Sequence, residues 1–281
     1  MDYIKPHEVV KTMLAAGHAK AALSVKDLLI RGFLSGALLG FATSLALTAA
    51  LQTGVPLVGA LVFPVSFVMI VLLGLELVTG SFAITTLAGV TGSRSVSRVA
   101  ANLGWVFLGN LIGSIVYGAL LAIALTNLGT VAPTGVAAKI VALAEAKTIG
   151  YAALGTAGAV TVFVKAVLCN WMVCLGVVMA MTSHSTIGKI AAMWLPVITF
   201  FAQGFEHSVV NMFVIPTGMM MGARVSVSDW WIWNQIPVTI GNLVGGMLFT
   251  GLFLYWTYRP APAAAPAFAP ESAPAAEPAR A

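Results

Sequence analysis

Six long apolar stretches, separated by short polar segments, dominate the pattern of the chain. Four of them continue for the roughly 20 residues that a membrane-spanning helix requires; they cover about 28–51, 100–125, 157–181 and 231–256. The other two begin near residues 55 and 190, and acidic residues and glycines interrupt them at about 76–81 and 204–208. A broken helix is stable at membrane depth only where it is buried in protein or lines a cavity. The pattern therefore predicts an all-α membrane protein with six transmembrane helices, the second and fifth of them broken.

The composition also indicates a protein surrounded by lipid. Only 8% of the 281 residues are charged, whereas about 25% is usual for a soluble domain. So few charges cannot cover a water-exposed surface, and the mean hydropathy of +0.98 agrees. The formal net charge is +5, but the basic residues are scattered, so nucleic acid is not an expected partner.

The chain divides into three parts. Residues 1–27 are expected to form a cytoplasmic amphipathic segment on the membrane surface. Its apolar face would hold Val9, Val10, Met13 and Leu14. Residues 28–258 form the transmembrane domain, and residues 259–281 form a Pro/Ala-rich tail that we expect to be disordered. Lysine and arginine gather on the side of both termini, which predicts that both ends lie in the cytoplasm.

The two broken stretches carry related motifs, which indicates an internal duplication. The first break reads Gly-Leu-Glu-Leu around Glu76, and the second reads Gly-Phe-Glu-His around Glu206. A Gly-Asn-Leu run follows each acid, starting at Gly109 and Gly241, which lie 33 and 35 residues further along the chain. Each half holds three spans, so the halves must cross the membrane in opposite directions. Such 3+3 inverted repeats place the solute path at their interface near the midplane, and the small residues of the Gly-Asn-Leu runs allow close helix packing.

His207 is the only histidine in an apolar stretch, and it lies at the second break. An ionisable residue at membrane depth is a functional candidate, although a neutral ring bonded to a free carbonyl would be a structural alternative. Its counterpart in the first half is Leu77, so the duplicated scaffold does not itself require a histidine. Glu76 and Glu206 are expected to support the breaks by accepting orphaned backbone N–H groups, and Glu206 would also bias the protonation of His207.

Short polar and basic side chains near the breaks are candidates for solute contact. Thr79 and Asn211 could donate hydrogen bonds to an anion, and Asn170 could face the same cavity; local capping is an equally good explanation of Asn211. Lys147 and Lys165 would raise the local concentration of anions. Phenylalanines lie one to two turns before each break and would form dry constrictions that exclude hydrated ions, or simply pack the helices. They are Phe63, Phe67, Phe200 and Phe201.

Several other functions are disfavoured by the residues present. Cys169 and Cys174 lie five residues apart on one helix and point to different faces, so they are not expected to form a disulfide. A single buried histidine cannot supply a bis-histidine haem or a zinc site, and we expect no metal and no cofactor. A neutral-solute pore of the aquaporin type shares the six-span inverted design and remains the alternative. It would need paired Asn-Pro-Ala motifs, and neither break has one.

With these residues in view, the chain resembles the formate/nitrite transporter family from about residue 5 to 258. Three stretches carry the resemblance: Gly74–Gly80, Leu168–Leu175 and Gly204–Phe213. The resemblance implies an aquaporin-like fold, a homopentamer with one pore per subunit, and a bacterial inner-membrane location. It implies a channel or transporter, not an enzyme, for small weak-acid anions: formate first, then nitrite or hydrosulfide.

The resemblance also assigns roles to residues. The central pore histidine of the family falls on His207, the threonine that faces it on Thr79, and the pore asparagine on Asn170. The constriction residues fall on Phe63, Phe200, Leu77 and Val78. The family usually has phenylalanine at the position of Val78, so Phe67 could rebuild that constriction. Lys147 would be the vestibule lysine, in a loop that is several residues longer here.

Overall fold

The computed structural model describes residues 2–259, which fold into helices apart from one isolated antiparallel bridge between Tyr3 and Ser183. The first half contains α1 (Pro6–Lys20), α2 (Val25–Thr53), α3 (Pro56–Val62), α4 (Pro64–Leu72), α5 (Val78–Val90) and α6 (Val96–Thr126). The second half contains α7 (Gly135–Ala146), α8 (Ile149–Ala152), α9 (Gly155–Ala180), α10 (Thr186–Ala202) and α11 (Ser208–Met220). It ends in one continuous helical rod made of α12 (Val227–Trp230), η1 (Trp231–Gln235), α13 (Ile236–Val244), η2 (Gly245–Leu252) and α14 (Phe253–Tyr258).

Four helical segments of the described range are long and apolar enough to cross a membrane. They are α2, α6, α9 and the rod Val227–Tyr258. These are the four uninterrupted stretches predicted from the pattern. The remaining apolar helices are shorter and come in two consecutive groups, α3 and α4 with α5, and α10 with α11.

The two interruptions have nearly the same backbone. Gly74 and Gly204 both have φ of +64°, a left-handed conformation that glycine adopts without strain. Leu77 and His207 then run extended into the next helix, with φ/ψ of −111°/116° and −113°/120°. The breaks cover residues 73–77 and 203–207. The first therefore comes earlier than the predicted 76–81, because α5 already begins at Val78.

The long helices pack through glycines. A Cβ atom at Gly36 of α2 would collide with the Asn110 backbone of α6, and one at Gly113 of α6 would collide with the Phe33 carbonyl of α2. In the second half, Gly245 of the rod similarly meets the Val167 carbonyl of α9. These close approaches confirm the packing role predicted for the Gly-Asn-Leu regions.

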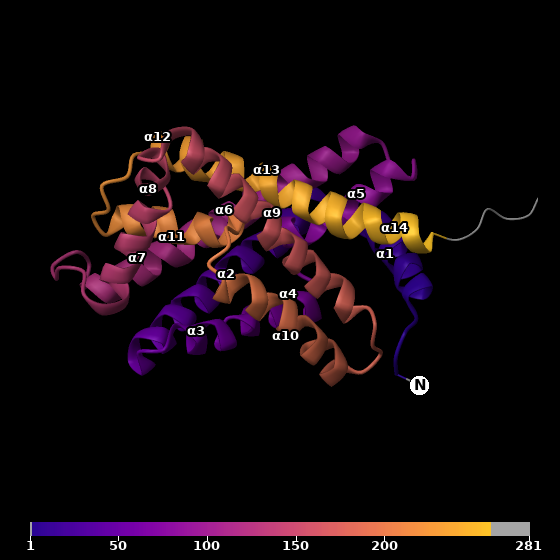
Figure 1. Ribbon diagram of the computed structural model, residues 1–281, viewed down its shortest axis with the longest axis horizontal. Helices are drawn as coiled ribbons and strands as arrows, with labels where there is room; N and C mark the ends of the chain where they lie inside the picture. Colours follow the sequence, from indigo (N-terminus) through magenta and orange to yellow (C-terminus); the bar gives the residue numbers. More distant parts are fainter. Residues whose placement is uncertain (1, 260–281) are drawn as a thin grey trace, which may run out of the picture.

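One face of the amphipathic N-terminal helix is buried in the protein. Val9, Val10 and Met13 of α1 are almost fully buried against Ile84 and other apolar side chains of α5. Figure 1 shows α1, α5 and α14 together at the end of the molecule that carries the N-terminus, with α7, α8 and α11 at the other end. The predicted apolar face of α1 is therefore right, and this face packs against α5. The expected position of α1 at the membrane surface stays a prediction.

Two further boundaries differ from the sequence predictions. The loop expected around Lys147 contains α7 and α8, and α7 packs on α11. The proposed boundary between residues 27 and 28 falls inside α2, which begins at Val25 after a Ser24 cap. The expectation for the Pro/Ala-rich tail concerns residues beyond 259 and lies outside the described range.

The N-terminus is anchored to the loop between α9 and α10. The Asp2 carboxylate accepts hydrogen bonds from the Ser183 hydroxyl at 2.7 Å and from the backbone N–H groups of His184 and Ser185 at 2.8 and 2.7 Å. The Ser183 hydrogen bond, supported by those of Ser185 and His184, holds the pKa of Asp2 below its usual value. This contact fixes the strand that leads into α1.

We expect Gly113→Ala to destabilise the protein by about 1–3 kcal/mol, because the added methyl group forces α6 away from α2. Thermal unfolding in detergent, followed by tryptophan fluorescence, measures the effect. Gly104→Ala on the same helix is the matched control, because a Cβ there has no neighbour within 4 Å. Equal melting temperatures for the two variants would contradict the packing argument.

Candidate functional site

Two buried asparagines hold the broken backbones in place. Asn110 accepts a hydrogen bond from the Val78 N–H at 2.9 Å and donates to the carbonyl oxygens of Glu76 at 2.9 Å and Gly32 at 2.8 Å. One amide thus satisfies both sides of the first break and ties it to α2. Its side chain is fully buried, where unpaired backbone groups would be costly.

Asn242 repeats this arrangement in the second half. It accepts from the Ser208 N–H at 2.8 Å and donates to the carbonyl oxygens of Glu206 at 2.9 Å and Ala166 at 2.8 Å. The two halves correspond residue for residue. In each break the asparagine accepts from the N–H two residues after the glutamate and donates to the glutamate carbonyl. The Gly-Asn-Leu repeat is visible in the sequence, but the sequence did not predict that its asparagine bridges the broken backbone.

The two carboxylates at the breaks pair with lysines. Both Glu76 oxygens lie 2.8 Å from the Lys20 Nζ atom, and a Glu206 oxygen lies 2.8 Å from the Lys147 Nζ atom. Both acids are 2% exposed. The prediction that they accept backbone N–H groups is not what the structure shows, because the asparagine amides already take that role at Val78 and Ser208.

The second carboxylate has more partners than the first. Glu206 also accepts from the Tyr151 hydroxyl at 2.9 Å and from the Asn211 amide at 2.7 Å. Glu76 has one further contact, with the Ser81 hydroxyl at 3.4 Å. Asn211, predicted to contact solute, is therefore directed at Glu206.

His207 and Thr79 meet across the two halves. The His207 Nε2 atom lies 3.0 Å from the Thr79 hydroxyl oxygen, and both residues are almost fully buried. The Nδ1 atom accepts a hydrogen bond from the Val210 N–H at 3.2 Å, so the ring also caps α11. Since Nδ1 acts as an acceptor, the neutral ring carries its proton on Nε2, directed at Thr79.

Two cavities of about 460 Å³ approach this pair from opposite breaks. The first, which we call the Lys147 cavity, is lined by residues that include Lys139, Lys147, Phe200, Phe201 and His207. The second, the Lys20 cavity, is lined by residues that include Lys20, Phe67, Leu77, His184 and Lys189. His207 and its counterpart Leu77 thus each line one cavity, and each cavity contains the lysine of the local ion pair.

The phenylalanines form a cluster beside the Lys147 cavity. The Phe63 ring stacks on Phe201 with centroids 3.9 Å apart and meets Phe200 edge-on at 5.8 Å. Phe200 in turn stacks on the His207 imidazole at 5.7 Å. Apolar rings therefore cover one side of the histidine.

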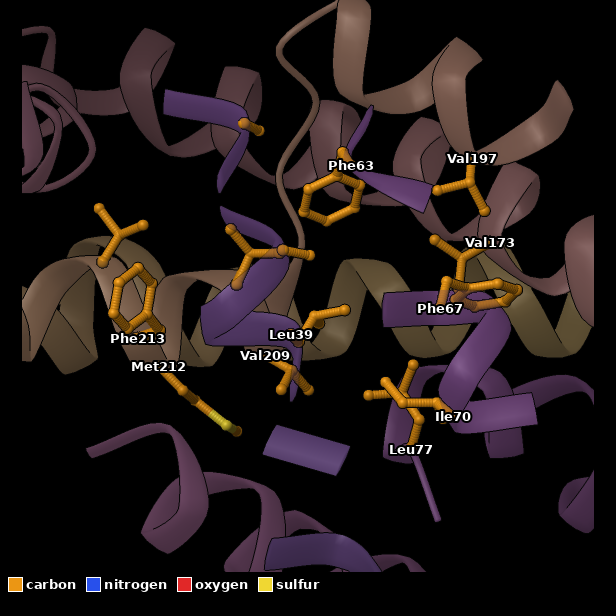
Figure 2. Packing of buried hydrophobic residues seen from close by; sticks show 14 of the residues in the cluster. Leu39, Phe63, Phe67, Ile70, Leu77, Val173, Val197, Val209, Met212 and Phe213 are labelled. Carbon is orange, nitrogen blue, oxygen red and sulfur yellow. The ribbon is translucent and has the colours of Figure 1, made fainter. Parts of the chain in front are cut away.

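The other predicted constriction residues separate into two groups. Phe67 and Leu77 line the Lys20 cavity, and Figure 2 shows Phe67 beside Val173 and Val197. The Val78 side chain is almost fully buried and is not among the residues that line either cavity, and the Val78 N–H donates to Asn110. The placement of Phe67 suits the constriction suggested for it.

Asn170 and Lys165 lie on α9 outside both cavity linings. The Asn170 amide donates to the Thr79 carbonyl at 3.0 Å and to the Asn242 carbonyl at 2.7 Å, so it holds the Thr79 backbone against the second half. The Lys165 Nζ atom lies 6.0 Å from the centre of the Tyr151 ring. The Cys174 thiol also donates to the Thr79 carbonyl at 3.2 Å, and both cysteines are free and buried.

Lys20 is the functional residue that the sequence analysis missed, since it was counted only among the basic residues that set orientation. The equivalence of Glu76 and Glu206 could have indicated it. A buried carboxylate needs a cation, so a lysine near one acid predicts a lysine near the other. Among residues 2–259 the structure has no group of three or more His, Cys, Asp or Glu side chains that could hold a metal ion.

These features define a membrane-embedded channel or transporter of several apolar helices, with two broken helices and a polar pair between two cavities. A family model described as "Formate/nitrite transporter" matches residues 7–256, and the chain belongs to the formate/nitrite transporter family. The members of this family are channels and transporters rather than enzymes.

Known relatives agree with this assignment. The chain is 36% identical over 274 residues to a "Probable formate transporter" of Methanothermobacter thermautotrophicus, covering 92% of this chain and 98% of the relative. The solved structure of an "FNT family ion channel" matches with a TM-score of 0.77 at 29% identity, covering 90% of this chain and 99% of that one. A "Pentameric formate channel with formate bound" matches with a TM-score of 0.67 at 25% identity, covering 83% and 97%.

We expect Asn242→Asp to destabilise the protein by about 1–3 kcal/mol for each carbonyl that loses its donor, because the acid keeps the acceptor for Ser208 but cannot donate. Thermal unfolding in detergent checks this. Asn127→Asp, at the exposed C-terminal cap of α6, is the control and should leave the melting temperature nearly unchanged. A loss no larger than that of the control would argue against the bridging role.

Lys147→Met leaves the Glu206 carboxylate buried without its cation, which should cost about 3–5 kcal/mol. The double variant Lys147→Met/Glu206→Gln removes both charges and should recover most of this loss. The control is Lys139→Met, because Lys139 lines the same cavity and forms no ion pair within residues 2–259. Chemical unfolding measures the stability of the three variants against that of the parent protein. A double variant no more stable than Lys147→Met would refute the pairing argument.

Proposed function

We propose that this protein is a channel for small monovalent weak-acid anions, with formate as the first candidate and nitrite or hydrosulfide next. The single observation that carries the proposal is the 3.0 Å contact between the His207 imidazole and the Thr79 hydroxyl, set between two lysine-bearing cavities. Family membership and the formate bound to one of the structurally similar channels support this substrate class.

The lysines account for the attraction of anions. Lys20 and Lys147 neutralise Glu76 and Glu206, so the buried acids do not repel an incoming anion. Lys139 and Lys189 line the two cavities and form no ion pair within the described part of the chain, so they supply net positive potential. Anions therefore concentrate at both mouths of the path.

The apolar residues make the passage of the anion through the constriction dependent on pH. An anion that enters the slit between Phe200 and Leu77 loses its hydration, at a cost of several kcal/mol. His207 and Thr79 offset part of this cost by donating hydrogen bonds. A weak acid can avoid the rest by accepting a proton and crossing as the neutral molecule, which makes the flux increase as the pH falls.

The arrangement in the membrane belongs to the same proposal. We infer six spans in two inverted halves, an aquaporin-like fold, and a pentamer with one path in each subunit. The equivalent breaks support the inverted repeat, and the structural similarity to a pentameric formate channel supports the assembly. The excess of basic residues near both termini supports a cytoplasmic location of the two ends in a bacterial inner membrane.

His207→Phe should abolish the pH-dependent part of formate flux, because without the Nε2–H donor the anion is no longer held at the apolar constriction where it would accept its proton. We expect flux into liposomes at about pH 5–6 to fall by about tenfold or more, equivalent to about 1.4 kcal/mol for each factor of ten. His184→Phe is the control, since His184 lines the Lys20 cavity away from Thr79 and should preserve the flux.

Undiminished and equally pH-sensitive flux through His207→Phe would reject the assignment. Osmotic swelling of the same liposomes in formate, nitrite and an uncharged solute covers the alternative. Swelling in the uncharged solute without anion flux would identify an aquaporin-type neutral-solute pore instead.

A further inference from the structure

A basic patch without acidic partners lies at the start of α6. Arg94 and Arg98 belong to it, and neither forms an ion pair with a carboxylate of residues 2–259. An Arg94 Nη atom lies 3.2 Å from the His18 Nε2 atom of α1, while the Arg94 Nε–H is buried and has no hydrogen-bond partner. A buried guanidinium N–H normally finds an acceptor. The described residues supply none for this N–H of Arg94.

Three acids of the first half already have partners of their own. Asp27 accepts from the Ser24 hydroxyl at 2.7 Å, and Glu76 pairs with Lys20. Glu8 pairs with Lys11 at 2.8 Å. The positive charge of Arg94 and Arg98 therefore remains for an external anion.

An exposed apolar stripe runs away from Arg98 along the same face of α6. Trp105, Leu108, Ile112 and Val116 follow Arg98 at intervals of seven, three, four and four residues, which places them above one another on a helix. Trp105 is 40% exposed and Ile112 is 43% exposed. Trp105 lies about 10 Å along the axis from Arg98, at 1.5 Å per residue, and tryptophan prefers the level of lipid headgroups.

The neighbouring helix repeats the design. α2 lies beside α6 in the same direction, with Gly32 against Gly109 and Gly36 against Asn110. Lys26 begins its exposed face and is followed by Ile30 and Leu34, both exposed. Two adjacent parallel helices thus each present a cation at one end and an apolar surface above it.

We infer that this face binds an anionic phospholipid, with its phosphate at Arg94 and Arg98 and an acyl chain along the stripe from Trp105 to Val116. A phosphate diester offers several acceptor oxygens to the N–H donors of the two guanidinium groups. A lipid would contact both the arginines and the apolar stripe on this face, whereas free phosphate would contact only the arginines. The face therefore favours a lipid. Anionic lipids are attracted to such basic segments next to spanning helices.

Quenching of tryptophan by brominated lipids tests this inference on the full-length protein in nanodiscs. The difference between the parent protein and Trp105→Phe isolates the signal of Trp105. Brominated phosphatidylglycerol should quench that signal at about fivefold lower mole fraction than brominated phosphatidylcholine does. Arg94→Gln/Arg98→Gln should remove this preference, while Arg94→Lys/Arg98→Lys should largely keep it.

Arg224→Gln is the matched control, since Arg224 lies at the opposite end of the molecule, 3.8 Å from Glu145. It should not alter the preference. Equal quenching by the two lipids in the parent protein would overturn the inference, and so would a preference that survives in the double Gln variant. Loss of the preference when inorganic phosphate is added in excess would identify a free-phosphate site, and absence of any quenching would identify the stripe as a contact between subunits.

Discussion

The structure depends on the ability of a single asparagine amide to satisfy an interrupted backbone inside a membrane protein. Lipid offers no hydrogen bonds, so every N–H and C=O group at a break must find a partner in the protein. Asn110 and Asn242 each supply one acceptor and two donors, and each also reaches the adjacent long helix. Because of these bonds, Leu77 and His207 can stand in extended backbone at the head of a half-helix.

The buried carboxylates also need partners inside the protein, and these partners come from the outer helices. Lys20 comes from the end of α1, and Lys147 follows α7, yet both reach an acid at a break. A buried charge without its counter-charge is strongly destabilising, so these outer helices are tied to the central path. The two lysines that line the cavities therefore also help to keep the breaks in shape.

The two halves share a scaffold but differ at one position. The backbone at Leu77 and at His207 is nearly identical, and each residue lines one cavity. Only the second half carries a proton donor there, and Thr79 of the first half faces it. The duplication explains why the two breaks share one backbone, and the departure from symmetry explains why a polar contact joins them.

The sequence by itself determined the four uninterrupted apolar helices, the two glycine-marked breaks and their equivalence, and it marked His207 and Thr79 as candidates beside the breaks. These features follow from local periodicity and from matched motifs, which a single chain displays directly. Only the tertiary structure decided that Lys20 meets Glu76, that Asn211 turns to Glu206, that the Val78 N–H donates to Asn110, and that α1 packs on α5. Lys20 and Glu76 lie 56 residues apart. No local pattern specifies such a pair, because the energy that selects it arises only when packing excludes water and each buried charge must find its nearest partner.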